Sequence, residues 1–532
     1  MNGRDGTPIP TPGLAILAAV AGALVLRAAF PEPAVWWAAP VGVALTLAAL
    51  RGRGTRSALI LGFVGGLVFW LTLIDWIRYF LGEASALGFG LVLLVALASF
   101  MSLWGALGAA LIAAVYRRAP TDPVWRVGVL PLVVAGLWTA REALSATIPW
   151  GGFSWGRVGF SQAGGALDGL FSWIGASGVS FVVVWLAALV VELVALRPSP
   201  LPRRTVERIL DLGPVARGLP AVALVLVLVL VPAWPVATRG TAVVAGVQGD
   251  TKSSYADPPE FAGDILRAQT AETLALAGRR LDLVVWPEGG NDTDPLRDPE
   301  AAAVWSGIVD RLGAPLLGWA VTQRGSRFFN TSVMWSADGP GALYDKRHPV
   351  PFGEYVPARA VFHAVVPDLV DLLQREYTPG QASPVVPVGG GRRAGVFICF
   401  DIADDALTRQ AVAGGAQFLI TPSNNTDFGR YSDESVQQLQ IARVRALESG
   451  RAIVSVSTVA TTAVIRADGS IAARVPTWRP GRVVAEVPLA RGTTPAMLAG
   501  GGVETGLGAL GIAGWVAALL FSAAPRARRR SS

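Results

Sequence analysis

The sequence contains very little cysteine and histidine. Its 532 residues include one cysteine, Cys399, and two histidines. A single cysteine excludes an internal disulfide and any metal cluster held by several thiolates. With two histidines a zinc site is a poor interpretation, because such sites need three or four protein ligands. We therefore expect no metal and no cofactor, and the lone thiol is either a small core residue or a group used for its own reactivity.

Charged residues are also scarce. They make up 16% of the chain, against 52% hydrophobic residues, and the mean hydropathy is +0.48. A water-soluble domain rarely has this composition, so the sequence predicts an integral membrane protein with a soluble portion. The formal charge of +7 would suggest nucleic-acid binding in a soluble chain. Here the arginines lie in short loops between apolar runs, where membrane topology explains them better, and we expect no nucleic-acid partner.

Apolar runs long enough to cross a bilayer, about 20 residues each, recur through the first half of the chain. They predict about eight membrane spans, near residues 12–29, 34–50, 57–80, 87–116, 124–144, 170–196, 219–237 and 503–524. The first run has a weak cationic start and is followed at once by further runs. We interpret it as a span rather than a cleaved signal peptide. Nothing in the sequence requires more than a monomer.

The positions of the arginines predict the orientation of these spans. Arginines fill every second connection, at 51–56, 117–126 and 197–217, and again the tail at 526–530. Loops rich in arginine face the cytoplasm, so both termini are expected there and the long segment before the last span is expected outside. The predicted parts are a transmembrane domain over 1–238, an extracytoplasmic domain over 239–492, and a final span with a basic tail over 493–532.

Residues 240–490 differ in character from the rest of the chain. Short β-branched runs predict strands at Val243–Gln248, Leu283–Trp286, Pro315–Ala320, Ser332–Trp335, Val396–Cys399, Phe418–Thr421 and Ile453–Thr458. Helical patterns cover 258–277, 299–312, 404–413 and 434–449, the last followed by Gly450 at a C-cap position. Strands that alternate with helices predict an α/β domain in which helices cover a sheet.

Three residues with catalytic chemistry each follow a predicted strand. Cys399 ends an apolar run, where a nearby helix dipole and backbone N–H groups would favour a thiolate, although a lone cysteine is more commonly a small core residue. Glu288 follows Val-Val-Trp-Pro and is either a general base or a solvated loop residue. Lys346 is either an oxyanion-stabilising cation or a surface charge. His348 is a rival base for the cysteine, which we rank below Glu288.

Two further segments each allow two interpretations. The loop over 148–162 is rich in tryptophan, phenylalanine and glycine. It is either an interfacial aromatic belt or a re-entrant wall of a lipid-binding cleft. The 349–378 stretch carries many apolar residues and either forms a lid-like arm or packs on the domain.

Together these motifs resemble the nitrilase (carbon–nitrogen hydrolase) superfamily. The resemblance covers nearly all of 240–490 and rests on Trp286-Pro287-Glu288, Lys346-Arg347-His348, Pro351-Phe352-Gly353-Glu354, Ile398-Cys399-Phe400-Asp401, Ser423-Asn424-Asn425 and Arg443–Arg451. It implies an αββα sandwich, a catalytic triad of Glu288, Lys346 and Cys399, and supporting roles for Glu354, Phe400 and Asp401.

The membrane half narrows the resemblance to the apolipoprotein N-acyltransferase family. The string over 346–357 and the loop over 149–162 also fit that family. The resemblance implies a bacterial inner-membrane enzyme that moves an acyl chain from a membrane phospholipid, through a thioester on Cys399, to the α-amino group of diacylated apolipoproteins. Ping-pong kinetics follow from such a covalent intermediate. It also suggests Trp150, Trp155, Tyr255 and Tyr355 as substrate-binding residues.

The chain departs from that family pattern at three places. Phe400 and Asp401 stand where an aromatic hydroxyl and a glutamate are more usual, Gly289 follows the glutamate in place of a small hydroxyl residue, and Tyr255 stands where a tryptophan is common. These departures bear on the choice of acyl donor more than on the chemistry.

Two other functions use part of the same pattern. A membrane-tethered amidase would share the triad and use water as the second nucleophile, but gives no reason for seven preceding spans. A scaffold or transporter with a degenerate nitrilase domain is disfavoured because all three triad residues are present.

Overall fold

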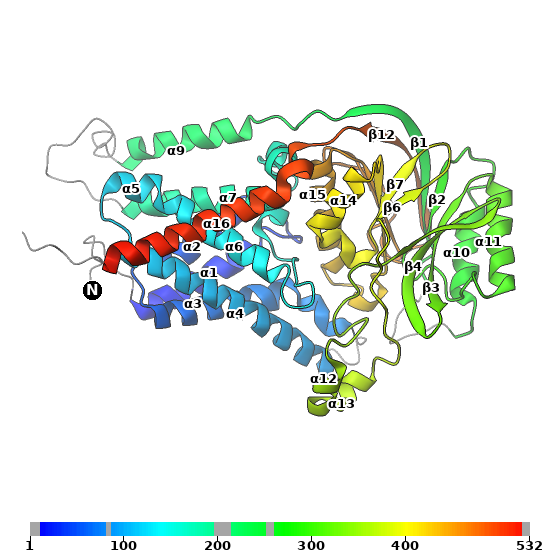
Figure 1. The fold of residues 1–532 in the computed structure, drawn as a ribbon, viewed down its shortest axis with the longest axis horizontal. Helices are drawn as coiled ribbons and strands as arrows, with labels where there is room; N and C mark the ends of the chain where they lie inside the picture. The colour runs from blue at the N-terminus through cyan, green and yellow to red at the C-terminus, as the bar shows by residue number, and fades with distance from the viewer. Residues whose placement is uncertain (1–10, 81–86, 196–213, 252–259, 524–532) are drawn as a thin grey trace, which may run out of the picture.

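The protein is divided into a helical bundle and a β-sandwich, which lie side by side (Figure 1). The computed structural model describes residues 11–80, 87–195, 214–251 and 260–523. Tyr255 and several arginines of the predicted cytoplasmic loops lie outside these described residues. The bundle comes from both ends of the chain, because the last helix returns to pack among the first ones.

The described helices of the bundle follow the apolar runs. They are α1 (Pro12–Arg27), α2 (Ala38–Leu50), α3 (Thr55–Leu73), α4 (Phe89–Arg118), α5 (Pro123–Gly128), α6 (Leu130–Ser145), α7 (Asp168–Ala195), α9 (Pro214–Val229) and α16 (Pro495–Ala523). Among the residues that the structure describes, five helical segments are long and apolar enough to cross a membrane, at 55–73, 89–118, 123–145, 168–195 and 495–520, whereas α1 and α2 are shorter. The predicted number of eight spans therefore stays a prediction.

Two predicted spans end well before their expected bounds. The span predicted near 57–80 is helix α3, which ends at Leu73 and is followed by a short 3-10 helix over Asp75–Tyr79. The apolar run at 219–237 was expected to be helical throughout, but helix α9 ends at Val229 and strand β1 begins at Ala237. Pro232 and Pro235 lie in the connecting stretch. A proline inside a helix removes a hydrogen bond and clashes with the preceding turn, so the apolar run cannot stay helical to its end.

The last helix packs closely against the bundle at two glycines. A Cβ atom at Gly136 of α6 would lie 2.6 Å from the backbone nitrogen of Gly511 in α16. Any side chain at these two positions would therefore force α6 and α16 apart. This contact attaches the C-terminal helix to the bundle although almost the whole sandwich separates the two in sequence.

The sandwich contains two six-stranded sheets in the described residues, in the orders β12-β1-β2-β3-β4-β5 and β11-β10-β9-β8-β7-β6. Their strands are β1 (Ala237–Gln248), β2 (Leu283–Val285), β3 (Leu316–Arg324), β4 (Arg327–Ser336), β5 (Gly339–Asp345), β6 (Val385–Pro387), β7 (Arg393–Val396), β8 (Phe418–Ser423), β9 (Ile453–Ser457), β10 (Ala463–Ile465), β11 (Ile471–Arg474) and β12 (Gly481–Arg491). Helices α10 (Asp264–Leu274) and α11 (Pro299–Leu312) cover the outer face, and α14 (Asp405–Ala413) and α15 (Glu434–Ser449) lie between the sheets and the bundle (Figure 1). The αββα sandwich is confirmed.

Three of the four helix predictions for this domain are close to the structure, whereas the helix predicted over 258–277 is the shorter α10, which begins only at Asp264 and ends at Leu274. The helix predicted at 299–312 has those bounds, and Asp298 caps it by accepting hydrogen bonds from the backbone N–H groups of Glu300 and Ala301. The helix predicted at 434–449 is α15, and Gly450 follows it with a left-handed φ of 62°. Strands β6, β10, β11 and β12 were not predicted. The first three are only three or four residues long, and Pro488 argues against a strand over β12.

A short helical arm projects from the sandwich beside the bundle (Figure 1). It consists of α12 (Arg359–Val365) and α13 (Pro367–Asp371). Val361 is 64% exposed and Val365 73% exposed, so much of its apolar surface is uncovered by the protein. The arm does not simply pack on the sandwich, and this favours the lid-like interpretation of the 349–378 stretch.

A buried ion cluster joins the bundle to the sandwich. Arg157, in the loop before α7, lies 2.8 Å from Asp405 of α14 and 3.1 Å from Glu504 of α16. Arg445 of α15 lies 2.6 Å from the same Asp405 and 2.7 Å from Glu448. Charges removed from water need such partners. The cluster therefore fixes how α14 and α15, which both follow Cys399 in sequence, sit on the bundle.

Candidate active site

Cys399 lies in a sharp turn between a strand and a helix. Strand β7 ends at Val396, so the predicted strand over Val396–Cys399 was wrong at its end, and Cys399 is the first residue of a 3-10 turn, η4 (Cys399–Ala403). The φ of Cys399 is +51°, in the left-handed region that a non-glycine residue rarely adopts. Strain of this kind is typical of functional sites. The turn places the thiol in a cavity rather than in the sheet.

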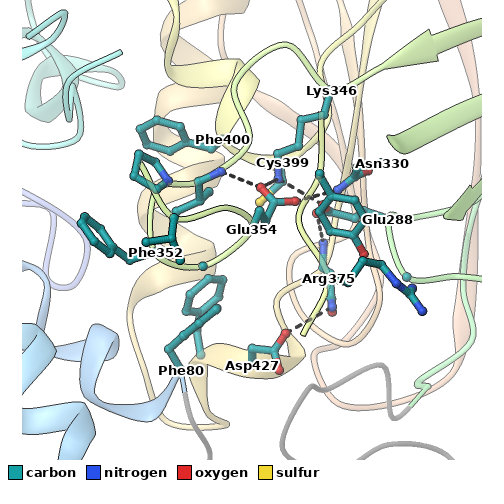
Figure 2. A pocket seen from close by; sticks show the side chains of 18 of the residues that line it. Phe80, Glu288, Asn330, Lys346, Phe352, Glu354, Arg375, Cys399, Phe400 and Asp427 are labelled. Carbon is teal, nitrogen blue, oxygen red and sulfur yellow. Dashed lines mark hydrogen bonds and ion pairs between the residues drawn. The ribbon is translucent and has the colours of Figure 1, made fainter. Parts of the chain in front are cut away.

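Glu288 and Lys346 come from the other sheet. Glu288 lies three residues after β2, and Lys346 directly follows β5. Lys346 Nζ is 3.2 Å from Glu288 Oε1 and 2.8 Å from Glu354 Oε2, and all three side chains are buried. Figure 2 shows these side chains converging on Cys399. The structure therefore brings the three predicted catalytic residues and Glu354 together between the two sheets.

Asn330 and Asn424 hold the two carboxylates in place. Asn330 of β4 donates from Nδ2 to Glu288 Oε1 (2.6 Å) and to Glu354 Oε1 (2.9 Å). The backbone N–H of Asn424 donates to Glu288 Oε2 (3.0 Å). Sequence reasoning missed Asn330, since an asparagine within a strand carries no signal until the strand register is known.

The charges at the site favour a neutral thiol beside a charged lysine. Burial would lower the pKa of Lys346, but Glu288 and Glu354 overcome this and hold the pKa well above its usual range. Burial and the charge of Glu288 raise the pKa of the Cys399 thiol well above its usual value, although Lys346 opposes them. Burial and the charge of Glu288 thus outweigh the backbone groups that were expected to favour a thiolate. A thiol in this state needs a general base before it can attack.

Asp401 connects the segment around Lys346 to the turn that contains Cys399 through hydrogen bonds. Its Oδ2 accepts hydrogen bonds from the Tyr344 hydroxyl (2.8 Å) and the backbone N–H of Arg347 (3.2 Å), and its Oδ1 accepts from the backbone N–H of His348 (2.9 Å). Oδ2 also accepts from the backbone N–H of Ile398 (3.3 Å). The side chain is fully buried, and burial raises its pKa. Asp401 is thus a positioning residue between the two segments.

His348, the rival base, faces away from this arrangement. Its Nε2 lies 2.6 Å from Asp404 Oδ2, an ion pair that raises the pKa of the imidazole in spite of burial. The imidazole is thus paired with Asp404, and in the part of the chain that the structure describes it makes no hydrogen bond to Cys399, so the geometry favours Glu288 as the base.

The aromatic loop forms one wall of the site. Phe400 lies parallel to Phe153 and to Trp155, with ring centroids 5.9 Å and 6.2 Å apart and interplanar angles of 8° and 11°. Trp155 is buried and donates to Gln437 Oε1 (2.6 Å). Trp150 is half exposed and packs edge-on against Phe352 of the sandwich. Of the two interpretations of this loop, the structure favours a wall of the cleft.

The cleft is a cavity of about 1140 Å³ between the bundle and the sandwich. Its membrane side includes Val92, Leu93, Ala96, Leu97 and Phe100 of α4. Cys399, Glu288 and Lys346 line the polar part. Trp150 and Trp155 line it too, whereas Tyr355 does not, and Tyr355 is half buried beside the cavity wall.

Two polar residues of α15 also reach this cavity. Gln438 donates from Nε2 to Cys399 Sγ at 3.6 Å, and Glu434 lines the cavity one helical turn earlier. Sequence reasoning used the apolar face of this helix and missed both. In the described residues no group of three or more histidine, cysteine or carboxylate side chains is arranged to hold a metal ion.

Known proteins resemble the chain over almost its full length. Residues 22–189 match the family model of the apolipoprotein N-acyltransferase N-terminal domain, and residues 243–494 match that of carbon-nitrogen hydrolase. An apolipoprotein N-acyltransferase of Mycolicibacterium smegmatis is 32% identical, over 97% of this chain and 87% of its own. One from Azotobacter vinelandii is 31% identical, over 96% of each chain.

Solved structures resemble the sandwich half of the chain. An amidase from Nesterenkonia sp. is 17% identical and covers 48% of this chain and 93% of its own, with a TM-score of 0.37. A Saccharomyces cerevisiae member of branch 10 of the nitrilase superfamily is also 17% identical, over 47% and 91%, with a TM-score of 0.37. The sequence relatives are more informative, since they span both halves. On the strength of these full-length relatives and of the two family models, the chain belongs to the apolipoprotein N-acyltransferase family.

Proposed function

We propose that this protein transfers an acyl chain from a membrane phospholipid to the α-amino group of diacylated apolipoproteins, through a thioester on Cys399. The observation that carries the proposal is the position of the triad. Glu288, Lys346 and Cys399 lie in the polar part of a cavity whose opposite wall is a candidate membrane helix. An acyl chain gains about 0.8 kcal/mol for each methylene that it buries, so such a wall suits a lipid better than a small amide.

In the first step, Glu288 takes the proton of the Cys399 thiol and the sulfur attacks an ester carbonyl of the phospholipid. Negative charge develops on the carbonyl oxygen, where Lys346 and the backbone N–H of Phe400 stabilise it. The tetrahedral intermediate collapses, Glu288 returns the proton to the leaving glycerol oxygen, and lysophospholipid departs. The acyl chain stays on the sulfur.

In the second step, the amine of the apolipoprotein attacks the thioester carbonyl. The same donors stabilise the oxyanion. Glu288 takes a proton from the attacking nitrogen and passes it to the sulfur as the carbon–sulfur bond breaks, which leaves the amide and the Cys399 thiol. Two separate half-reactions with a covalent intermediate give ping-pong kinetics. The cavity must exclude water, because water would hydrolyse the thioester and turn the transferase into a lipase.

We place the protein in the bacterial inner membrane as a multi-pass monomer, with the catalytic domain outside and both termini in the cytoplasm. The arginine-rich connections support this orientation. Both substrates carry acyl chains, so the nucleophile has to work at the membrane surface.

Intact-protein mass spectrometry of purified protein in phospholipid, without acceptor, tests this proposal. Wild type is expected to gain one acyl-sized mass that neutral hydroxylamine removes, and Cys399→Ala to gain none. A diacylated lipopeptide with a free N-terminus should discharge the adduct as a triacylated product. Absence of an adduct with every phospholipid, together with hydrolysis of small amides, would replace the transferase by a tethered amidase.

A further inference from the structure

Glu434 is a buried carboxylate that the reaction described so far does not use. It is the first residue of α15, it is 2% exposed, and it lines the same cavity as Cys399. Its Oε2 accepts a hydrogen bond from Asn425 Nδ2 at 2.7 Å. Within the described part of the chain, its Oε1 has no hydrogen-bond partner. One carboxylate oxygen is therefore left for a ligand in the cavity.

A hydrogen-bonded chain holds Glu434 close to the nucleophile. Asn425 Nδ2 also donates to Gln438 Oε1 (3.3 Å), and Gln438 in turn donates to Cys399 Sγ (3.6 Å). Ser457 of β9 fixes Asn425 by donating to its Oδ1 at 2.6 Å. The charge of Glu434 is near enough to help raise the pKa of the Cys399 thiol. Glu434 thus stands beside the sulfur, on the helix side of the cavity.

Packing alone gives no reason for a carboxylate at this position. A buried carboxylate with a single hydrogen bond is unfavourable unless it becomes neutral or finds a cation. Burial, helped by the charge of Glu288, raises the pKa of Glu434 to about 8, although the Asn425 bond opposes this. With no cation beside it, Glu434 is therefore largely neutral at neutral pH, and an ammonium ion bound at Oε1 would lower its pKa again and favour the carboxylate. An α-amino group has a pKa of about 7.7–8.0, close to that of Glu434, so a proton can pass between the two groups at little energetic expense.

The second half-reaction needs such a group. The acceptor amine is mostly an ammonium ion at neutral pH, and an ammonium ion has no lone pair with which to attack. It must lose one proton before it attacks the thioester and a second one as the amide forms. Glu288 can take only one of the two.

We propose that Glu434 binds the ammonium form of the acceptor amine and takes its first proton. The inference rests on the proposed function. The proton moves from nitrogen to Glu434 Oε1, and the free amine then forms the bond to the thioester carbon. Glu288 takes the second proton from nitrogen as the carbon–sulfur bond breaks, and passes it to the sulfur. The products are the amide, the Cys399 thiol and a proton on Glu434, which the solvent removes.

Other titratable groups share the cavity with Glu434 and contribute to its electrostatic potential. Those that line it are Glu288, Lys346, Glu354, Cys399, Asp427, Asp292, Asp294, Arg297 and Arg375. Lys346 already forms ion pairs with two carboxylates, because its Nζ lies 3.2 Å from Glu288 Oε1 and 2.8 Å from Glu354 Oε2. A cationic acceptor therefore meets a site in which Glu434 lacks a cation of its own among the described residues.

The test compares how two nucleophiles discharge a preformed acyl-enzyme. Wild type, Glu434→Gln, Glu434→Asp and Glu486→Gln are first loaded with phospholipid. The Glu486→Gln control makes the same chemical change at an exposed position of β12. Each loaded protein is then mixed with a diacylated lipopeptide, whose amine is largely protonated at neutral pH, or with hydroxylamine, which is largely unprotonated there.

Glu434→Gln is expected to load normally and to react with hydroxylamine within about twofold of wild type. It should react with the lipopeptide about 100-fold more slowly, the usual loss when a general base is removed. This deficit should shrink above about pH 9, where the lipopeptide amine already arrives neutral. Glu434→Asp should retain part of the lipopeptide rate, and Glu486→Gln all of it.

Three outcomes would overturn the inference. One is lipopeptide discharge by Glu434→Gln at the wild-type rate. Another is an equal loss with both nucleophiles, which would indicate a structural role. The third is failure of both Glu434 variants to load although they remain folded, which would assign the residue to the first step. If wild type itself does not load, the proposed function fails, and the inference fails with it.

Discussion

Replacing Lys346 with methionine tests whether its charge holds the catalytic carboxylates together. Lys346→Met keeps most of the side-chain volume but leaves Glu288 and Glu354 buried without the cation that lies 3.2 and 2.8 Å from them. Removing one partner of a buried pair lowers stability by about 3–5 kcal/mol. At about 2–4 °C per kcal/mol for a domain of this size, the unfolding temperature in detergent should fall by roughly 6–20 °C.

The double variant Lys346→Met/Glu354→Gln separates charge from packing. It removes one of the two unpaired carboxylates, and Asn330 and the backbone N–H of Asn424 still bind the other. We expect it to regain at least about half of the lost unfolding temperature. Neither variant should form the acyl-enzyme faster than about 1% of the wild-type rate, because both lack an oxyanion donor.

The difference in stability between wild type and Lys346→Met depends on pH in a direction that the titration of Lys346 and of its carboxylate partners determines. The pKa of Lys346 is raised well above its usual range, so its stabilising charge is present throughout the neutral range and is lost only as the pH rises through that raised value. In Lys346→Met the unpaired carboxylates can take up protons as the pH falls. The deficit of the single variant should therefore shrink between about pH 8 and pH 5. A double variant as unstable as the single one would show that packing, not charge, is lost, and would refute the reasoning.

Three further predictions concern the surroundings of the triad. Phe153→Ala removes a ring that lies parallel to Phe400 at 5.9 Å. The rate of acyl-enzyme formation from phospholipid should fall about tenfold or more, whereas the rate with a short water-soluble ester should fall less than about twofold. Equal losses of rate with both substrates would contradict a lipid-binding wall. Arg157→Met leaves Glu504 without its cation, whereas Asp405 keeps Arg445 at 2.6 Å. The unfolding temperature should therefore drop by an amount that corresponds to about 1–3 kcal/mol, and an unchanged value would mean that the cluster does not attach the sandwich to the bundle. Asp404 raises the pKa of His348, so the ion pair stabilises the fold below the usual pKa of histidine and this contribution is lost as the pH rises through the raised value. The difference in unfolding temperature between wild type and His348→Gln should accordingly be largest below about pH 6 and smallest above about pH 8.

The sequence predicted well wherever local signals agree with one another. The helices at 299–312 and 434–449 have clear apolar faces, an aspartate before the first and a glycine after the second, and both have those bounds in the structure. The predicted strand at Cys399 was wrong because the apolar run continues past β7 into the turn. Hydrophobicity cannot distinguish a strand from a buried turn, since both are surrounded by the core.

The sequence by itself determined the kinds of chemistry that are available. A lone cysteine, a glutamate after one strand, a lysine after another and apolar runs of bilayer length are all visible in the linear order. Only the tertiary structure decided which of these groups meet. Cys399 comes from one sheet and Glu288 and Lys346 from the other, and their approach depends on how the two sheets face each other. The partners Asn330, Gln438 and Glu434 became visible for the same reason: their contacts join residues far apart in sequence, whose proximity no local pattern encodes.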